Sequence, residues 1–121
     1  MKVYSVDLSA WMTSFRHPMF ISGPQPTLEV PPLSTILGMI NCAAGRYLPH
    51  DDHLVGYYFD YAGKGVDLET IYMIEAGGTR EAGLMGRSNV CERGFLFEPF
   101  LRLYSTSPEI IDYFRAPAYP L

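Results

Sequence analysis

Two kinds of apolar spacing alternate along this chain, and they predict strands and helices in a definite order. In residues Lys2–Ser9, apolar and polar side chains alternate as they do in a strand with one buried face. Residues Leu33–Ala44 instead carry apolar side chains at helical spacing. Pro32 suits the first turn of such a helix, and Gly45 supplies a stop. The first part of the chain therefore predicts a strand, a connection and a helix.

The rest of the chain contains further strand patterns and one short helix. Leu54–Tyr61 predicts a second strand, and Asp67–Glu75 predicts another strand or the arm of a hairpin. Phe95–Ser105 predicts a later strand, in which Pro99 implies a bulge or an edge position. The sequence Ser-Pro-Glu from Ser107 combines an N-cap, a proline for the first turn and an acid, and it predicts a short helix.

Two connecting segments are unusual. Trp11–Pro32 is longer than most loops of compact domains, and such loops are generally functional or disordered. Its large apolar and aromatic side chains argue against disorder. Gly77–Gly94 has five glycines, three arginines and little apolar content, which predicts a flexible insertion.

The predicted order is strand, helix, strand, insertion, strand and helix. This is the order of a ferredoxin-like (RRM-like) α+β unit that lacks its last strand. We expect an antiparallel sheet with helices on one face, and a thumb-like insertion at about residues 62–94 between the second and third strands. Residues 1–121 then form one domain. A missing strand would leave backbone groups unpaired beside the first strand, so we expect a partner chain or self-association.

Composition limits the functions open to the chain. A net charge of −4 argues against a free-standing nucleic-acid binder, because phosphate contacts require Lys and Arg. The charge is unevenly distributed, so a local basic face stays possible. No apolar run approaches the roughly 20 residues of a membrane helix, and no signal segment opens the chain. Cys42 and Cys91 lack metal-ligand spacing, and for Cys42, in the predicted helix, we expect a buried free thiol in preference to a disulfide. We also expect no metal, no cofactor, no membrane contact and a cytoplasmic protein.

Five short motifs add a family resemblance to this picture. They are, in chain order, Phe15–Pro18, Pro31–Thr35, Asp67–Glu69, Arg93–Phe97 and Ala116–Leu121. In this order and spacing they resemble the fifth CRISPR-associated (Cas) protein family of the RAMP superfamily, most closely its subtype B group. Members of that family continue past the last motif into a final strand and a second portion. The resemblance therefore implies that this chain is the N-terminal half of such a protein.

The resemblance also implies a function in antiviral defence. The family's subunit caps the 5′ handle of the guide RNA in type I Cascade complexes. This chain would then be a non-catalytic RNA-binding subunit that contacts the large and backbone subunits and meets target DNA only indirectly. In the family the thumb contacts guide RNA, so Arg80, Arg87 and Arg93 would pair with phosphates or stack on bases. The alternative is that they are ordinary surface arginines.

Two other groups are candidates for RNA binding. Ser34 and Thr35 at the predicted helix start could hold a phosphate, or they could simply cap the helix, and both roles are compatible. Arg16 and His17 could grip the 5′ handle, with neighbouring phenylalanines available for base stacking. Those aromatic side chains could equally pin the long loop to the core.

Two rival functions stay open. One subtype of the family cleaves precursor guide RNA without a metal, which requires a base and a cation. His17 and Tyr47 are the nearest candidates here, but no Lys-His pair follows the third strand as that subtype requires. His50–His53 has the spacing of no standard metal site and is better explained as a surface turn. The other rival is a purely structural adaptor that binds only proteins, consistent with the acidic balance.

Overall fold

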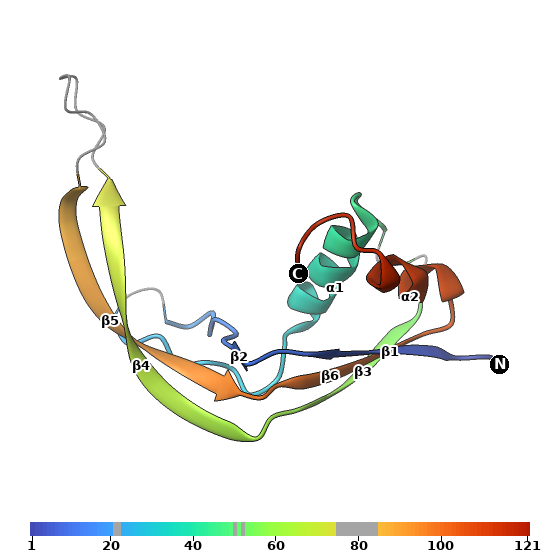
Figure 1. Cartoon of the computed structure of the whole chain (residues 1–121), viewed down its shortest axis with the longest axis horizontal. Coiled ribbons are helices and arrows are strands. Elements are labelled where there is room, and N and C mark those ends of the chain that lie inside the picture. The colour runs from blue at the N-terminus through green and yellow to red at the C-terminus, as the bar shows by residue number, and fades with distance from the viewer. Residues whose placement is uncertain (21–22, 50, 52, 75–84) are drawn as a thin grey trace.

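The computed structural model of the chain describes residues 1–20, 23–49, 51, 53–74 and 85–121. Two helices and six strands follow one another along it. They are arranged as two three-stranded sheets that meet at a corner, with both helices beside the first sheet (Figure 1). The fold is α+β, as the sequence predicts.

The first sheet is the core of a ferredoxin-like unit. Its strand order is β1 (Tyr4–Ser9), β6 (Phe100–Ser105) and β3 (Val55–Asp60), and each pairing is antiparallel. This is the order expected for the first, third and second strands of that unit. Within the described residues, no strand pairs with the outer edge of β1.

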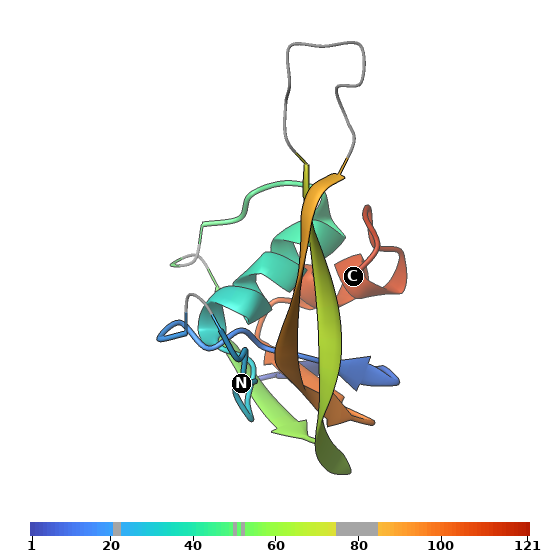
Figure 2. The same ribbon diagram turned by 90° about the vertical axis from the view of Figure 1, so that its left-hand side faces the viewer.

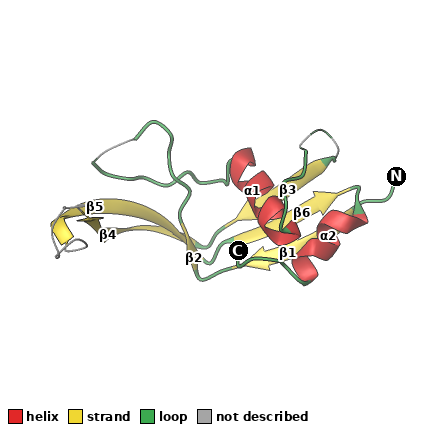
Figure 3. Cartoon of the chain, turned by 90° about the horizontal axis from the view of Figure 1, so that it is seen from above, coloured by secondary structure: helices red, strands yellow, loops and turns green. Residues whose placement is uncertain are grey.

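Both helices, α1 (Leu33–Ala44) and α2 (Pro108–Arg115), cover the same face of this sheet (Figure 3). The core between them and the sheet is apolar because alternate strand residues point inward. Its fully buried members are Ile36, Ile40, Leu101, Leu103 and Ile110. The bounds predicted for α1 are confirmed, and Gly45 ends the helix in the left-handed conformation at φ 72°.

The second sheet is dominated by one long hairpin. Strands β4 (Gly63–Ile74) and β5 (Met85–Phe97) pair antiparallel, and the short β2 (Met12–Thr13) pairs with the other edge of β5. The hairpin is a twisted ribbon (Figure 2), and it extends away from the helices (Figure 1). In chain order the hairpin is inserted between β3 and β6, which are the second and third strands of the ferredoxin-like unit. The predicted position of the thumb is therefore confirmed.

The prediction of a flexible insertion over Gly77–Gly94 is wrong for its second part. Residues 85–94 belong to β5, and their backbone follows the ladder of β4. Gly94 is buried, and an added Cβ would lie 2.9 Å from the backbone nitrogen of Thr27. Glycine at this position therefore allows the backbone of the long loop to lie close to β5, and it does not make the strand flexible. The remainder of the segment lies outside the described residues.

The predicted single strand Phe95–Ser105 is divided in two. Glu98 has a φ of 52° and Pro99 follows it, so the chain leaves the second sheet and enters the first at this point. Trp11, in the short connection between β1 and β2, is hydrogen-bonded to this corner: the Glu98 N–H donates to the Trp11 carbonyl at 2.9 Å. Pro99 therefore marks a corner between two sheets, and not a bulge within one strand.

The predicted short helix is confirmed as α2, with Ser107 at its N-cap and Pro108 in its first turn. Ile110 and Ile111 are its buried residues. In the described part of the chain, no helix is long and apolar enough to cross a membrane.

The sheet face opposite the helices carries an ordered ion pair. Arg102 donates two hydrogen bonds to Asp7, at 2.7 and 2.9 Å, and its guanidinium lies 5.5 Å from the centre of the Phe100 ring. These hydrogen bonds lower the pKa of Asp7 below its ordinary value of 3.8. The pair joins β1 to the central strand β6.

We expect this ion pair to make stability depend on pH in the acid range. Because the folded-state pKa of Asp7 is lowered, its contribution is complete above pH 3.8 and is lost as pH falls through the lower folded value. An Asp7→Asn variant should therefore lose stability relative to wild type at neutral pH, and the difference should shrink in acid. Thermal melts between pH 2 and pH 7 measure this. Asp112→Asn, which breaks an exposed 3.3 Å contact within α2, is the control.

Candidate nucleic-acid interface

The long loop before α1 is held against the hairpin by backbone hydrogen bonds. Gln25 donates to the carbonyl of Glu92 at 2.6 Å and accepts from the N–H of Gly94 at 2.8 Å. Ser14 Oγ donates to the Gly94 carbonyl at 2.7 Å. The loop therefore extends the second sheet and is ordered by it. It lies between the hairpin and α1 (Figure 1).

The two halves of this loop also bond to each other, and this positions Arg16. Thr27 Oγ1 accepts from the N–H of Phe15 at 2.8 Å, and the N–H of Leu28 donates to the Phe15 carbonyl at 2.8 Å. Arg16 and Thr27 face each other in an isolated bridge. The backbone of Arg16 is thus fixed while its side chain is exposed. Within the described residues, its guanidinium has no ion-pair partner.

The aromatic neighbours of Arg16 are divided between two roles. Phe15 packs edge-on against Phe59 with ring centres 5.5 Å apart, so it pins the loop to the core. Phe20 is exposed and lies edge-on to His17 at 5.1 Å. His17 is half-buried, and its Nδ1 accepts from the N–H of Met19 at 3.2 Å. Of the two phenylalanines, Phe20 is the one whose ring is exposed on the outer surface of the loop, whereas Phe15 is half-buried.

The start of α1 does not use its hydroxyl groups as caps. The N-cap is Pro32, which has no side-chain donor or acceptor, and no side-chain capping bond forms. The predicted capping by Ser34 and Thr35 is therefore wrong: the N–H of Thr35 bonds to the Pro32 carbonyl at 2.9 Å instead. Within the part of the chain that the structure describes, neither hydroxyl has a hydrogen-bond partner. The hydroxyls and the positive end of the helix are thus available to an anion.

Of the three hairpin arginines, Arg93 is the one whose side chain the structure describes. Arg93 makes an ion pair with Glu69 on the neighbouring strand, and its side chain is 25% exposed. Its charge is therefore largely neutralised within the hairpin. Arg87 lies opposite Met73 in the β4–β5 ladder, and the position of its side chain is not described. Arg80 lies outside the described residues.

Within the described residues, the two candidates for nuclease chemistry, His17 and Tyr47, make no hydrogen bond or ring contact with each other. His17 lies in the long loop, and Tyr47 follows α1 as an exposed residue. Of the predicted surface turn His50–His53, residues 50 and 52 lie outside the described residues. Among the residues that the structure describes, no group of three or more His, Cys, Asp or Glu is placed to hold a metal. Cys42 is a free thiol, as predicted, but it is half-buried and not buried; Cys91 is also free.

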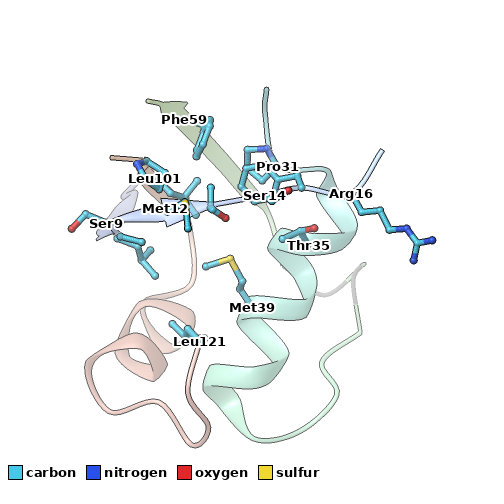
Figure 4. Close-up of a pocket in the computed structure, with 15 residues that line it drawn as sticks. Ser9, Met12, Ser14, Arg16, Pro31, Thr35, Met39, Phe59, Leu101 and Leu121 are labelled. Carbon is cyan, nitrogen blue, oxygen red and sulfur yellow. The ribbon is translucent and has the colours of Figure 1, made fainter. Parts of the chain in front are cut away.

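A cavity of about 420 Å³ lies beside this loop and was not apparent in the sequence. It is bounded by the end of β1, by β2, by the start of the loop and by α1 (Figure 4). Met39 and Thr35 point into it from α1, whereas the side chain of Arg16 points outward from its rim. No local pattern could have revealed it, because its walls come from segments that are far apart in sequence.

Comparisons with known proteins match both the sequence and the fold. The family model described as CRISPR-associated protein (Cas_Cas5) matches residues 3–74, which is more than half of the chain. A search of curated proteins finds no match. A chain of the solved structure titled "CRISPR RNA-guided surveillance complex" has the same fold, with a TM-score of 0.67 and 24% identity. That match covers 98% of this chain and 55% of the solved chain, so this chain spans about half of its length. On the strength of the family match, this chain belongs to the Cas5 family of CRISPR-associated proteins.

Proposed function

We propose that this chain is a non-catalytic RNA-binding subunit of a CRISPR effector complex that holds the 5′ handle of the guide RNA. Membership of the Cas5 family supports this function, and so does the likeness in fold to a chain of an RNA-guided surveillance complex. The partners would be guide RNA and the large and backbone subunits, with target DNA met indirectly. The complex would act in the cytoplasm.

The pairing of the basic side chains points to Arg16 as an RNA contact. Lys64, Arg93, Arg102 and Arg115 are each paired with a carboxylate, whereas Lys2, Arg16 and Arg46 have no such partner within the described residues. Arg46 bonds to the Tyr113 hydroxyl at 3.0 Å instead, and Arg16 is exposed. Arg16 also lies on the ordered loop that leads to α1, whose first turn offers the hydroxyls of Ser34 and Thr35. A cation next to a helix N-terminus is a suitable arrangement for a phosphate of the RNA backbone.

We expect Arg16→Ala to weaken binding of guide RNA about 10- to 100-fold, because a hydrogen bond to a charged group contributes about 1.5–3 kcal/mol. The measurement is titration of labelled RNA with and without its 5′ handle, in the presence of the partner subunits. Arg115→Ala, which removes an exposed arginine from α2, is the matched control. Equal binding by both variants would contradict the role of Arg16.

The same titration, analysed on a denaturing gel, separates the rival functions. Handle-dependent binding of uncut RNA supports the capping role. Cleavage without added metal would instead support an endoribonuclease. Assembly with protein subunits but without any handle preference would support a protein-only adaptor. That third function is favoured by the exposed apolar side chains of Val66 and Leu68 on the hairpin and by the pairing of most described cations with acids.

A further inference from the structure

We propose that the cavity between β1, β2 and α1 receives one unpaired base of the bound RNA, while Arg16 at its rim contacts a phosphate. The inference rests on the proposed function and assigns a subsite within it.

The shape of the cavity suits a small planar group. Its volume of about 420 Å³ lies in the range of about 300–1,000 Å³ that is typical of small-ligand sites. Most of its lining is apolar and includes Met12, Met39, Phe15 and Phe59. Aromatic rings and methionine side chains are good surfaces for an unstacked base, because they pack against its flat face and adapt to its outline.

The polar groups suit a nucleotide more than an apolar side chain. Ser14 is already bonded to the Gly94 carbonyl, so its hydroxyl helps to hold the wall. Thr35 also lines the cavity (Figure 4), and its hydroxyl has no hydrogen-bond partner among the described residues. It can donate to or accept from the edge of a base.

The charge at the rim indicates an anionic ligand. Among the side chains of the described residues that line the cavity, that of Arg16 is the only charged one, and none is a carboxylate. This is notable in a chain whose net charge is −4. Because the guanidinium points outward while the lining is apolar, the site is complementary to a ligand with a planar apolar part and an exterior negative charge. An extruded nucleotide has both.

The test is an abasic scan of the 5′ handle combined with a filled cavity. In wild-type protein with its partner subunits, removal of one particular base should weaken RNA binding about 5- to 150-fold, the range for loss of a stacked base. In the Met39→Trp variant the tryptophan side chain fills the cavity, so this variant should bind intact RNA less tightly, by about the factor that removal of the base costs wild-type protein. Removal of the same base should then weaken binding to this variant little further. Such a non-additive pair shows that base and cavity interact.

Two further variants keep the result interpretable. Leu54→Trp adds the same bulk at an exposed position at the opposite end of β3, and it should bind RNA like wild type. Thr35→Val replaces the hydroxyl by a methyl group of similar size. Its RNA affinity therefore tests the hydrogen bond between Thr35 and the edge of the base, even if Met39→Trp fails to fold. Each variant is checked by thermal melting.

The outcomes distinguish this inference from the proposed function. A flat abasic scan, or a penalty that persists unchanged in Met39→Trp and Thr35→Val, would overturn the base site while handle-dependent binding persists. If Met39→Trp weakened association with a protein subunit and left RNA affinity unchanged, the occupant would be a protein side chain and the inference would be wrong. Absence of handle-dependent binding by wild-type protein would overturn both.

Discussion

Replacement of Leu103 by alanine is expected to lower the free energy of unfolding by roughly 2–5 kcal/mol, the range for truncation of a fully buried leucine. Leu103 is 1% exposed and lies in β6, the central strand of the first sheet. Its cross-strand neighbours are Val6 in β1 and Tyr57 in β3, and its side chain belongs to the apolar core between the sheet and the two helices. Small domains are stabilised by only about 5–15 kcal/mol in total, so this loss would be severe.

The measurement is urea unfolding followed by circular dichroism. Val66→Ala is the matched control, because Val66 lies in β4 with 68% of its surface exposed and loses little packing. We expect the control to change stability by less than about 0.5 kcal/mol. Similar midpoints for the two variants would show that the assigned core does not carry the stability of the fold.

Gly94→Ala is expected to disturb both stability and RNA binding. An added Cβ would lie 2.9 Å from the Thr27 nitrogen and 3.4 Å from the Cα of Pro26. These are backbone atoms that cannot swing away, so the loop must lift from β5. Overpacking of this kind costs roughly 1–3 kcal/mol. Since the same loop positions Arg16, we also expect weaker binding of guide RNA.

Gly56→Ala separates this effect from the general consequence of replacing a glycine in a strand. Gly56 lies in β3, and a Cβ there would meet nothing within 4 Å. We expect its stability to stay within about 1 kcal/mol of wild type and its RNA affinity to be unchanged. Equal effects of the two alanines, by thermal melting and RNA titration, would show that contact between loop and hairpin does not position the site.

The elements that the sequence predicts correctly are those whose signals are local. The bounds of α1 follow from the apolar spacing of Leu33–Ala44 and from Gly45, which ends the helix as predicted. The strands of the first sheet follow from alternation, since each has one buried face. The start of α2 is equally local, because Ser107 and Pro108 suit the first turn of a helix and not a strand.

Most of β5 shows no such local signal. Residues 85–94 have few apolar side chains, and they are extended because β4 supplies hydrogen-bond partners along them. The corner at Glu98 and Pro99 is also a tertiary feature, because the crossing from β1 to β2 bonds to it. The conformational propensity of a segment depends on its own residues, so it gives no information about a hydrogen-bond partner that is distant in the sequence.

The candidate site is divided in the same way. Sequence alone identified Arg16, His17, Ser34 and Thr35 as a group worth testing, since unusual loops and helix starts can be recognised from neighbouring residues. Only the tertiary structure decided which cations are free. Arg93 meets Glu69 across the hairpin, 24 residues away, whereas Arg16 is exposed on a loop fixed by β5. The cavity was likewise decided by packing, because its walls come from separate segments that only the fold brings together.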